Sequence, residues 1–186
     1  MAGPLLVTFV AGQTGHWRIT RQEVVIGEAL AAADRLAVHE APAANVALQT
    51  GEWRLRGTVS NIRYTRRTEI DSLAARQEGL NRPAARHAAL IPLRKSAAWW
   101  ALAQDERRAI FEEQSRHIGI GLEYLPQVAR RLHHSRDLGE AFDFLTWFEF
   151  APAHEALFDS MLARLRASAE WAYVDREIDI RLVLET

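Results

Sequence analysis

The order of the elements predicted from residue 88 onward limits the folds that this chain of 186 residues can adopt. Alternating or β-branched stretches predict strands, and stretches of good helix formers between turn residues predict helices. The predicted elements are a strand at 88–93, a helix at 97–121, strands at 127–135 and 142–150, a helix at 152–168 and a strand at 171–184. This order is typical of a ferredoxin-like fold.

The first 87 residues repeat the order more loosely. Strands are predicted at 5–11, 17–20 and 51–64 and a helix at 68–80, while residues 28–33 favour a helix and 36–38 a strand. We therefore expect an α+β fold with a shortened, degenerate N-terminal ferredoxin-like half at 1–87 and a C-terminal ferredoxin-like half at 88–186. Together the two halves would form a dimeric α+β barrel, with the helices outside and a pocket between helices and sheet.

The composition excludes several classes of function. The chain has no cysteine, which excludes disulfides, zinc ribbons, iron–sulfur clusters and any thiolate nucleophile or ligand. Its net charge of -1 provides no overall field for nucleic acid or an anionic membrane, so neither is an expected partner. The short apolar run near the N-terminus has no basic region before it, which predicts a cytoplasmic protein rather than a secreted one.

The common catalytic motifs do not occur in this sequence. Seven histidines are present, but none belongs to the HExxH pattern or to another compact metal-ligand spacing. The GxGxxG, GxxxxGK[ST] and GxSxG motifs of nucleotide-binding proteins and serine hydrolases are also missing. A zinc hydrolase, a nucleotide-binding enzyme and a serine hydrolase are therefore not expected.

His117 is the histidine that helix geometry singles out. Ile110, Gln114, His117 and Gly121 follow one another at three or four residues and would share one face of the predicted helix. That face is partly apolar, so His117 is expected to point inward. A histidine in such a place is either a hydrogen-bonded core residue or a metal ligand, and the spacing leaves both interpretations open.

Two long segments resemble the short, dimeric members of the chlorite dismutase family: AALIPLRKSAAWWALAQDERRAIFEEQSRHI and EYLPQVARRLHHSRDLGEAFDFLTWFEF. The strand NIRYT at 61–65 and the terminal EWAYVDREIDIRL extend this resemblance over most of the chain from about residue 55 onward. The resemblance implies a haem b enzyme that converts chlorite into chloride and dioxygen, by cleaving an O–Cl bond and forming an O–O bond.

The resemblance also implies roles for individual residues. The histidine that closes the RHI helix binds the haem iron in this family, which assigns His117, with Glu170 as acceptor for its other ring nitrogen and Lys95, the only lysine of the chain, nearby. Arg130, the first arginine of VARRLHHS, matches the arginine over the open face of the haem. The remaining positions implied around the haem are Gln77, which can hold Arg130 near the pocket, Trp100 beside the proximal face, Tyr64 and Leu125.

Strand alternation sends the side chains of Arg130 and Arg131 in opposite directions, so Arg130 can be internal while Arg131 is expected to be external. Trp99 and Trp100 open the predicted helix, and core packing is expected for at least one of them. His133 and His134 are expected to be structural or exposed, because the family offers no ligand at these positions.

The implied chemistry needs a small anionic substrate held close to iron. A guanidinium is permanently charged and offers several donors, so Arg130 suits the binding of chlorite, whereas peroxidase activity, which benefits from a distal acid or base, should be weak. Three other interpretations stay open: a haem-binding or haem-transfer protein without turnover, a haem-pathway enzyme of the coproheme decarboxylase branch, and a cofactor-free monooxygenase of the same fold. The resemblance to dimeric members implies a homodimer.

Overall fold

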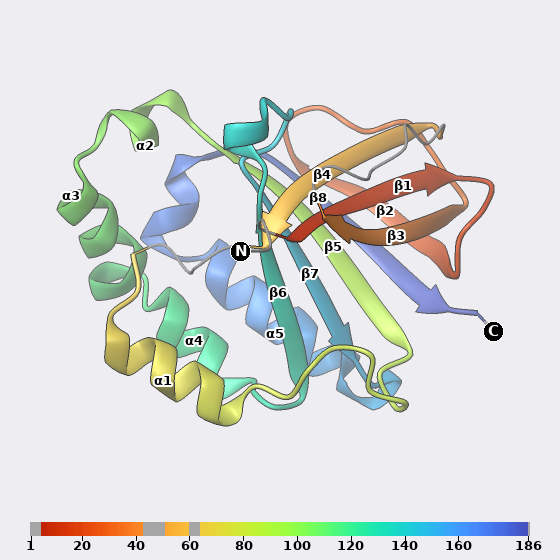
Figure 1. The fold of residues 1–186 in the computed structure, drawn as a ribbon. Coiled ribbons are helices and arrows are strands. Elements are labelled where there is room, and N and C mark those ends of the chain that lie inside the picture. Colours follow the sequence, from red (N-terminus) through yellow and green to blue (C-terminus); the bar gives the residue numbers. More distant parts are fainter. Residues whose placement is uncertain (1–4, 43–50, 60–63, 186) are drawn as a thin grey trace.

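The computed structural model describes residues 5–42, 51–59 and 64–185, and these residues form an eight-stranded antiparallel barrel with helices along one flank (Figure 1). The strands are β1 (Leu5–Gly12), β2 (Trp17–Ile26), β3 (Arg35–Pro42), β4 (Trp53–Val59), β5 (His87–Lys95), β6 (Val128–His134), β7 (Phe144–Phe150) and β8 (Val174–Leu184). Around the barrel they follow the order β1-β3-β2-β8-β5-β7-β6-β4, and β4 closes it by pairing with β1.

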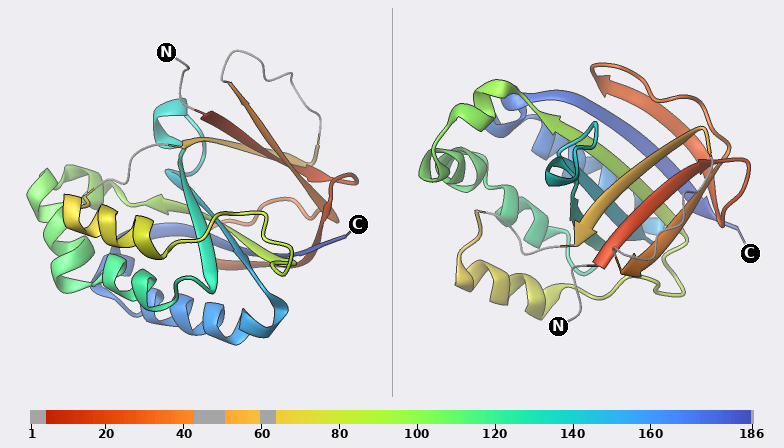
Figure 2. Two further views of the ribbon diagram at one scale, coloured as in Figure 1. Left: turned by 60° about the horizontal axis from the view of Figure 1, so that its bottom comes forward. Right: turned by 45° about the horizontal axis from the view of Figure 1, so that its top comes forward.

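The helices surround the outer face of the second half of the barrel. They are α1 (Arg67–Arg76), α2 (Ala97–Ala101), α3 (Gln104–Arg108), the π-helix η2 (Ala109–Gln114), α4 (His117–Glu123) and α5 (Glu155–Arg166), with short 3-10 turns at η3 (Arg136–Leu138), η4 (Pro152–His154) and η5 (Ala169–Tyr173). Figure 2 shows that the helices stay on one side of the barrel, while β1–β3 lie away from them. None of the helices in the described ranges is long and apolar enough to cross a membrane.

The two faces of the strands have different surroundings because side chains alternate along a strand. Leu90 of β5, Trp147 of β7 and Ile180 of β8 belong to the apolar core inside the barrel. Their neighbours Ile91 and Phe148 face outward and pack beneath α5 with Phe158, Met161, Leu162 and Leu165. The helix-covered outer face therefore has an apolar core of its own.

The element order predicted from residue 88 onward is confirmed, since β5 is followed by helices, β6, β7, α5 and β8. These four strands lie side by side as β8-β5-β7-β6, that is, fourth, first, third, second. The first four strands follow the same rule as β4-β1-β3-β2, although β1 to β4 follow one another without a helix in the described residues. The α+β barrel is thus observed, with the helices concentrated in the second half.

The helix expected at residues 28–33 does not form, and this prediction was wrong. Side chains from elsewhere in the fold take up the carbonyl oxygens that a helix would use. Arg176 donates to the carbonyls of Glu28 and Ala29, and Gln22 donates to those of Leu30 and Ala31. The segment therefore connects β2 to β3 without regular secondary structure, whereas the strand predicted at 36–38 lies within β3.

The single helix predicted at 97–121 is broken into α2, α3, η2 and α4. Leu102 and Ala103 are extended between α2 and α3, and Arg116 adopts a left-handed conformation with φ of 53° before α4. Gly119 and Gly121 lie inside α4, which continues to Glu123, two residues beyond the predicted end of the helix. A π-helix and a left-handed residue change the angular spacing, so the argument for one shared face from Ile110 to Gly121 does not hold.

Candidate functional site

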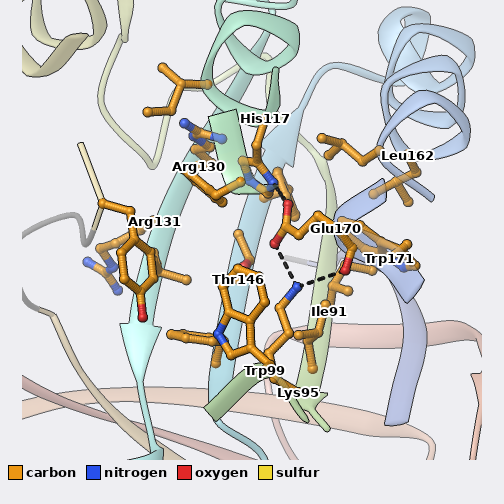
Figure 3. Close-up of a pocket in the computed structure, with 18 of the residues that line it drawn as sticks. Ile91, Lys95, Trp99, His117, Arg130, Arg131, Thr146, Leu162, Glu170 and Trp171 are labelled. Carbon is orange, nitrogen blue, oxygen red and sulfur yellow. Dashed lines mark hydrogen bonds and ion pairs between the residues drawn. The ribbon is translucent and has the colours of Figure 1, made fainter. Parts of the chain in front are cut away.

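A partly open cavity of about 280 Å³ lies between the outer face of β5–β7 and the helices (Figure 3). Its walls are mainly apolar and aromatic, with Ile91, Phe148 and Leu162 among them. Six of the residues singled out from the sequence line it: Tyr64, Gln77, Lys95, His117, Arg130 and Glu170. The structure therefore gathers, at one cavity, residues that lie up to 106 positions apart in the chain.

Glu170 links His117 to Lys95 at one wall of this cavity (Figure 3). Its Oε2 lies 2.7 Å from His117 Nδ1, and its Oε1 accepts a hydrogen bond of 2.7 Å from Lys95 Nζ. Burial opposes ionisation of this carboxyl group, but the charges and hydrogen bonds of His117 and Lys95 outweigh burial and hold the pKa of Glu170 at about 2. The carboxylate is thus ionised, and His117 donates its Nδ1 proton to it.

The other ring nitrogen of His117 is available to a ligand. In the described part of the chain, no hydrogen bond or ion pair to Nε2 is found. Two aromatic rings lie close to parallel with the imidazole, Phe111 with centroids 4.4 Å apart and Trp171 with centroids 6.4 Å apart. The imidazole is therefore fixed in orientation and tautomer, with an unused lone pair on Nε2.

Local contacts of the main chain place His117 at the first position of α4. Glu112 in the π-helix accepts hydrogen bonds from the N–H groups of Ile118 at 2.6 Å and Gly119 at 3.2 Å, so its carboxylate caps the start of α4. Ser115, just before the break, accepts a hydrogen bond of 2.9 Å from the N–H of Glu170. The break in the helix thus brings the histidine and its carboxylate partner together.

Arg130 lies on the cavity-facing side of β6, together with Leu132. Its guanidinium makes no hydrogen bond or ion pair with any residue in the described ranges, while burial lowers the pKa of Arg130 and the charge of Glu112 opposes that shift. Gln77 contacts Arg130 through the main chain, since its Nε2 donates to the Arg130 carbonyl oxygen at 2.9 Å. An unpaired guanidinium in a cavity is a binding site for an anion.

Arg131 points into the barrel, and the expectation that it lies outside was wrong. Its Nη2 forms an ion pair of 2.5 Å with Glu40, and its Nε donates to His133 Nε2 at 3.0 Å. His133 is fully buried and donates its Nδ1 proton to the carbonyl of Leu145 at 2.9 Å. Alternation does separate the two guanidinium groups, but the second face of β6 belongs to the barrel, where Arg131 is only partly exposed to solvent.

A sequence model of the family described as chlorite dismutase matches residues 34–183 of this chain. The chain belongs to the chlorite dismutase family. The crystal structure of dimeric chlorite dismutases from Nitrobacter winogradskyi is 51% identical in sequence, covers 95% of this chain and 99% of that chain, and superimposes with a TM-score of 0.87. The family is thus supported over nearly the whole described structure.

More distant members of the chlorite dismutase family share the fold. A mutant chlorite dismutase from Candidatus Nitrospira defluvii is 18% identical, covers 98% of this chain and 92% of that chain, and has a TM-score of 0.71. The chlorite dismutase of Ideonella dechloratans is 39% identical over 66 residues, which make up 36% of this chain and 22% of that protein. The matched segment therefore spans about a fifth of that relative.

Two residues expected from the family resemblance do not line the cavity. The half-buried Trp100 donates from Nε1 to Asp143 at 3.2 Å, and the guanidinium of Arg136 lies 4.0 Å from its ring centroid. Leu125 packs with Leu73 and Ile118 behind the wall. Trp99, which is 1% exposed, lines the cavity in place of Trp100.

Sequence reasoning missed the two rings that flank His117. Trp171 directly follows Glu170 in the chain, so its position next to a suspected carboxylate was a usable signal. Phe111 offered no such signal, because it reaches the imidazole only through the π-helix and the break at Arg116. The described residues contain no group of three or more His, Asp or Glu side chains that could hold a metal.

Proposed function

We propose that this protein is a haem b enzyme that converts chlorite into chloride and dioxygen. The observation that carries the proposal is the pairing, in one cavity, of an imidazole with a free Nε2 and a guanidinium without a partner. Membership of the chlorite dismutase family supports the same conclusion.

The residues present fit a haem. The cavity is lined mainly by apolar and aromatic side chains, as cofactor sites are, and His117 offers the nitrogen that binds iron. Glu170 accepts the Nδ1 proton of His117, which fixes the tautomer and makes the imidazole a stronger donor, while Lys95 keeps Glu170 in place. His117 is accordingly the proposed iron ligand, with Glu170 and Lys95 as the residues that orient it.

Arg130 is the proposed substrate-binding residue. The balanced reaction, in which ClO2⁻ yields Cl⁻ and O2, consumes and releases no proton, so a group that binds an anion without titrating is sufficient. When bound, the haem iron would supply the centre at which the O–Cl bond of chlorite breaks. Arg130 would hold the incoming anion and keep the chlorine-containing fragment close until the two oxygen atoms have joined.

Gln77 and Tyr64 would support this arrangement from the other walls. Gln77 fixes the main chain of Arg130 by its hydrogen bond to the carbonyl oxygen. The hydroxyl of Tyr64 accepts a hydrogen bond of 3.3 Å from Arg107, and its ring meets Trp99 edge to face with centroids 6.0 Å apart. Both residues hold the site in shape and neither is assigned as an acid or base, so peroxidase activity should be weak.

The finer structural predictions belong to the same proposal. The shared strand order of the first and second halves supports two ferredoxin-like halves, 1–87 and 88–186, with the first shortened. The dimeric chlorite dismutases from Nitrobacter winogradskyi, at 51% identity, support a homodimer. The cytoplasmic location stays a prediction.

The decisive experiment is oxygen evolution from chlorite by the purified, haem-loaded protein, with the Soret band recorded on the same sample. We expect one O2 per chlorite consumed. A normal haem spectrum without oxygen would replace the proposal by a haem-binding or haem-pathway role. Failure to take up haem would favour a cofactor-free function of the same fold.

A further inference from the structure

The first turn of α4 carries His117 and, at Gly121, the main-chain position against which the Arg130 guanidinium lies. His117 opens α4, and Gly121 follows four residues later, so the two positions lie on the same face of this helix. Glu112 holds the start of α4 by accepting hydrogen bonds from the N–H groups of Ile118 and Gly119. The position of Gly121 relative to the imidazole is therefore set by a capped helical turn.

Gly121 leaves free the space that the Arg130 guanidinium occupies. A Cβ atom added at residue 121 would lie 2.9 Å from Arg130 Nη1, 3.2 Å from Cζ and 3.4 Å from Nη2. A carbon atom cannot remain 2.9 Å from a guanidinium nitrogen without a shift of one of the two groups. The main chain of Arg130 is held in β6 and by Gln77, so the guanidinium would have to move by rotation about its own side-chain bonds.

The backbone conformation does not explain why residue 121 is a glycine. Gly121 has an ordinary helical conformation and lies within α4, where glycine is a poorer helix former than any other residue except proline. Gly119 of the same helix differs, since a Cβ there would meet only Glu112 Oε1 at 3.5 Å and the Arg116 side chain at 3.6 Å or beyond, which are ordinary contacts. Of the two glycines, only Gly121 touches a residue of the site.

We propose that Gly121 is a positioning residue for Arg130. The Arg130 guanidinium packs against the Cα of Gly121, and because Gly121 lies one turn after His117 in α4, this contact sets the position of the guanidinium relative to the imidazole. This inference rests on the proposed function, in which Arg130 binds the substrate anion. A side chain at residue 121 would displace the guanidinium and misalign its donors toward an anion in the cavity, while leaving His117, Glu170 and the fold in place.

The contact itself is tested on the full chain, without and with haem, by a double-mutant cycle of thermal stability. Gly119→Ala is the matched control, because it gives the same gain in helix propensity in the same helix and should raise Tm by about 2–4 °C. We expect Gly121→Ala to give no such gain, because the guanidinium of Arg130 must move away from the new methyl group. In the Arg130→Gln background, Gly121→Ala should raise Tm as Gly119→Ala does. Additive effects would overturn the proposed contact.

The functional consequence is tested with fluoride, a small anion that binds ferric haem and accepts hydrogen bonds. Loss of a hydrogen bond from a charged donor should weaken fluoride binding about tenfold or more in Arg130→Gln. Gly121→Ala should weaken it severalfold, Gly119→Ala should not change it, and Gly121→Ala should add nothing in the Arg130→Gln background.

The outcomes separate this inference from the proposed function. If Arg130→Gln weakens fluoride binding and Gly121→Ala leaves the dissociation constant as in Gly119→Ala, the positioning role of Gly121 is overturned and the role of Arg130 stands. If neither Arg130→Gln nor Gly121→Ala changes fluoride binding, the role of Arg130 fails and the inference fails with it.

Discussion

Arg130 and Arg131 are neighbours on β6 and both border the cavity, but their guanidinium groups have different partners. Arg130 faces the helix-covered cavity and its guanidinium has no hydrogen bond or ion pair in the described ranges. Arg131 also borders the cavity, but its guanidinium turns toward the barrel side of β6, where Glu40 and His133 occupy its donors. The comparison indicates that the side-chain type does not mark the site, whereas an unsatisfied charged group in a cavity does.

The two histidines His117 and His133 differ in the same way. Both hold an acceptor at Nδ1, Glu170 for His117 and the Leu145 carbonyl for His133. His133 also accepts a hydrogen bond at Nε2, from Arg131, so both of its ring nitrogens are used inside the barrel. His117 keeps Nε2 free in the cavity, which makes it the imidazole that can bind a metal.

The largest expected effect is the loss of haem from His117→Ala. Removal of the proposed iron ligand should weaken haem affinity by more than about 100-fold, because changes in residues that only support a metal ligand already weaken binding about 10- to 100-fold. His133→Gln, the matched change in the barrel interior, should bind haem as the unaltered protein does. Titration of the haem-free proteins with haem, followed at the Soret band, measures both. Equal affinities in the two variants would exclude His117 as the ligand.

Substitution of Arg130 should lower turnover, whereas substitution of Arg131 should lower stability. We expect Arg130→Gln to lower kcat/KM for chlorite about 100- to 1,000-fold, the usual loss when one preorganised donor to a developing anion is removed. Arg131→Gln should keep most of the turnover and instead lower the free energy of unfolding by about 1–3 kcal/mol, because His133 Nε2 loses its donor in a buried place. Oxygen-electrode kinetics and urea unfolding give the two numbers. Comparable losses of turnover would mean that both arginines serve the substrate.

The buried His133 makes the barrel interior sensitive to acid. Burial, with a smaller contribution from Arg131, lowers the pKa of His133 to about 4, against the Leu145 hydrogen bond that raises it. Between pH 6.5 and 4 the unfolded chain therefore binds a proton that the folded chain does not, so stability should fall as the pH falls through this window, by about 3 kcal/mol in total. Urea unfolding at several pH values should show a flatter profile for His133→Gln. Identical slopes would contradict a depressed pKa.

The smallest expected effect comes from the carboxylate that orients the ligand. Glu170→Gln keeps a hydrogen-bond acceptor beside His117 but removes the charge, so haem affinity should fall about 10- to 100-fold and the reduction potential of the iron should rise. Glu149→Gln is the control in the barrel interior, where the buried Glu149 accepts hydrogen bonds from Trp147 Nε1 at 2.8 Å and the Asn81 N–H at 2.6 Å. The reduction potential of the iron, measured by spectroelectrochemical titration, should shift only in Glu170→Gln. An unmoved potential would show that Glu170 does not tune the ligand.

The elements of the second half could be predicted because their signals are local. Alternation in β5 to β8 and the helical spacing after Pro152 reflect which face each residue buries, and both patterns are visible within short windows. The break before His117 was not predictable in this way. It depends on Glu112 as a cap and on the bond from Glu170 to Ser115, a residue 55 positions away.

Most of the residues that form the site could be predicted, but their arrangement around the cavity could not. The resemblance pointed to Lys95, His117, Arg130 and Glu170, and the structure brings all four to the cavity. It also pointed to Trp100 and Leu125, which lie behind the wall because Asp143 holds Trp100 and the Leu73 cluster holds Leu125. Adjacent positions such as Trp99 and Trp100 have the same local signal, and only packing decides which ring enters the cavity.

The sequence by itself determined the α+β class, the order of elements from residue 88 onward and the residue types available for chemistry, because propensity, alternation and the absence of cysteine act over short distances. The tertiary structure alone decided the barrel closure, the inward position of Arg131 with Glu40, and the contact of Arg130 with Gly121. These features join residues far apart in the chain or on separate elements, so their energies exist only once the barrel has closed and the helices have packed against it.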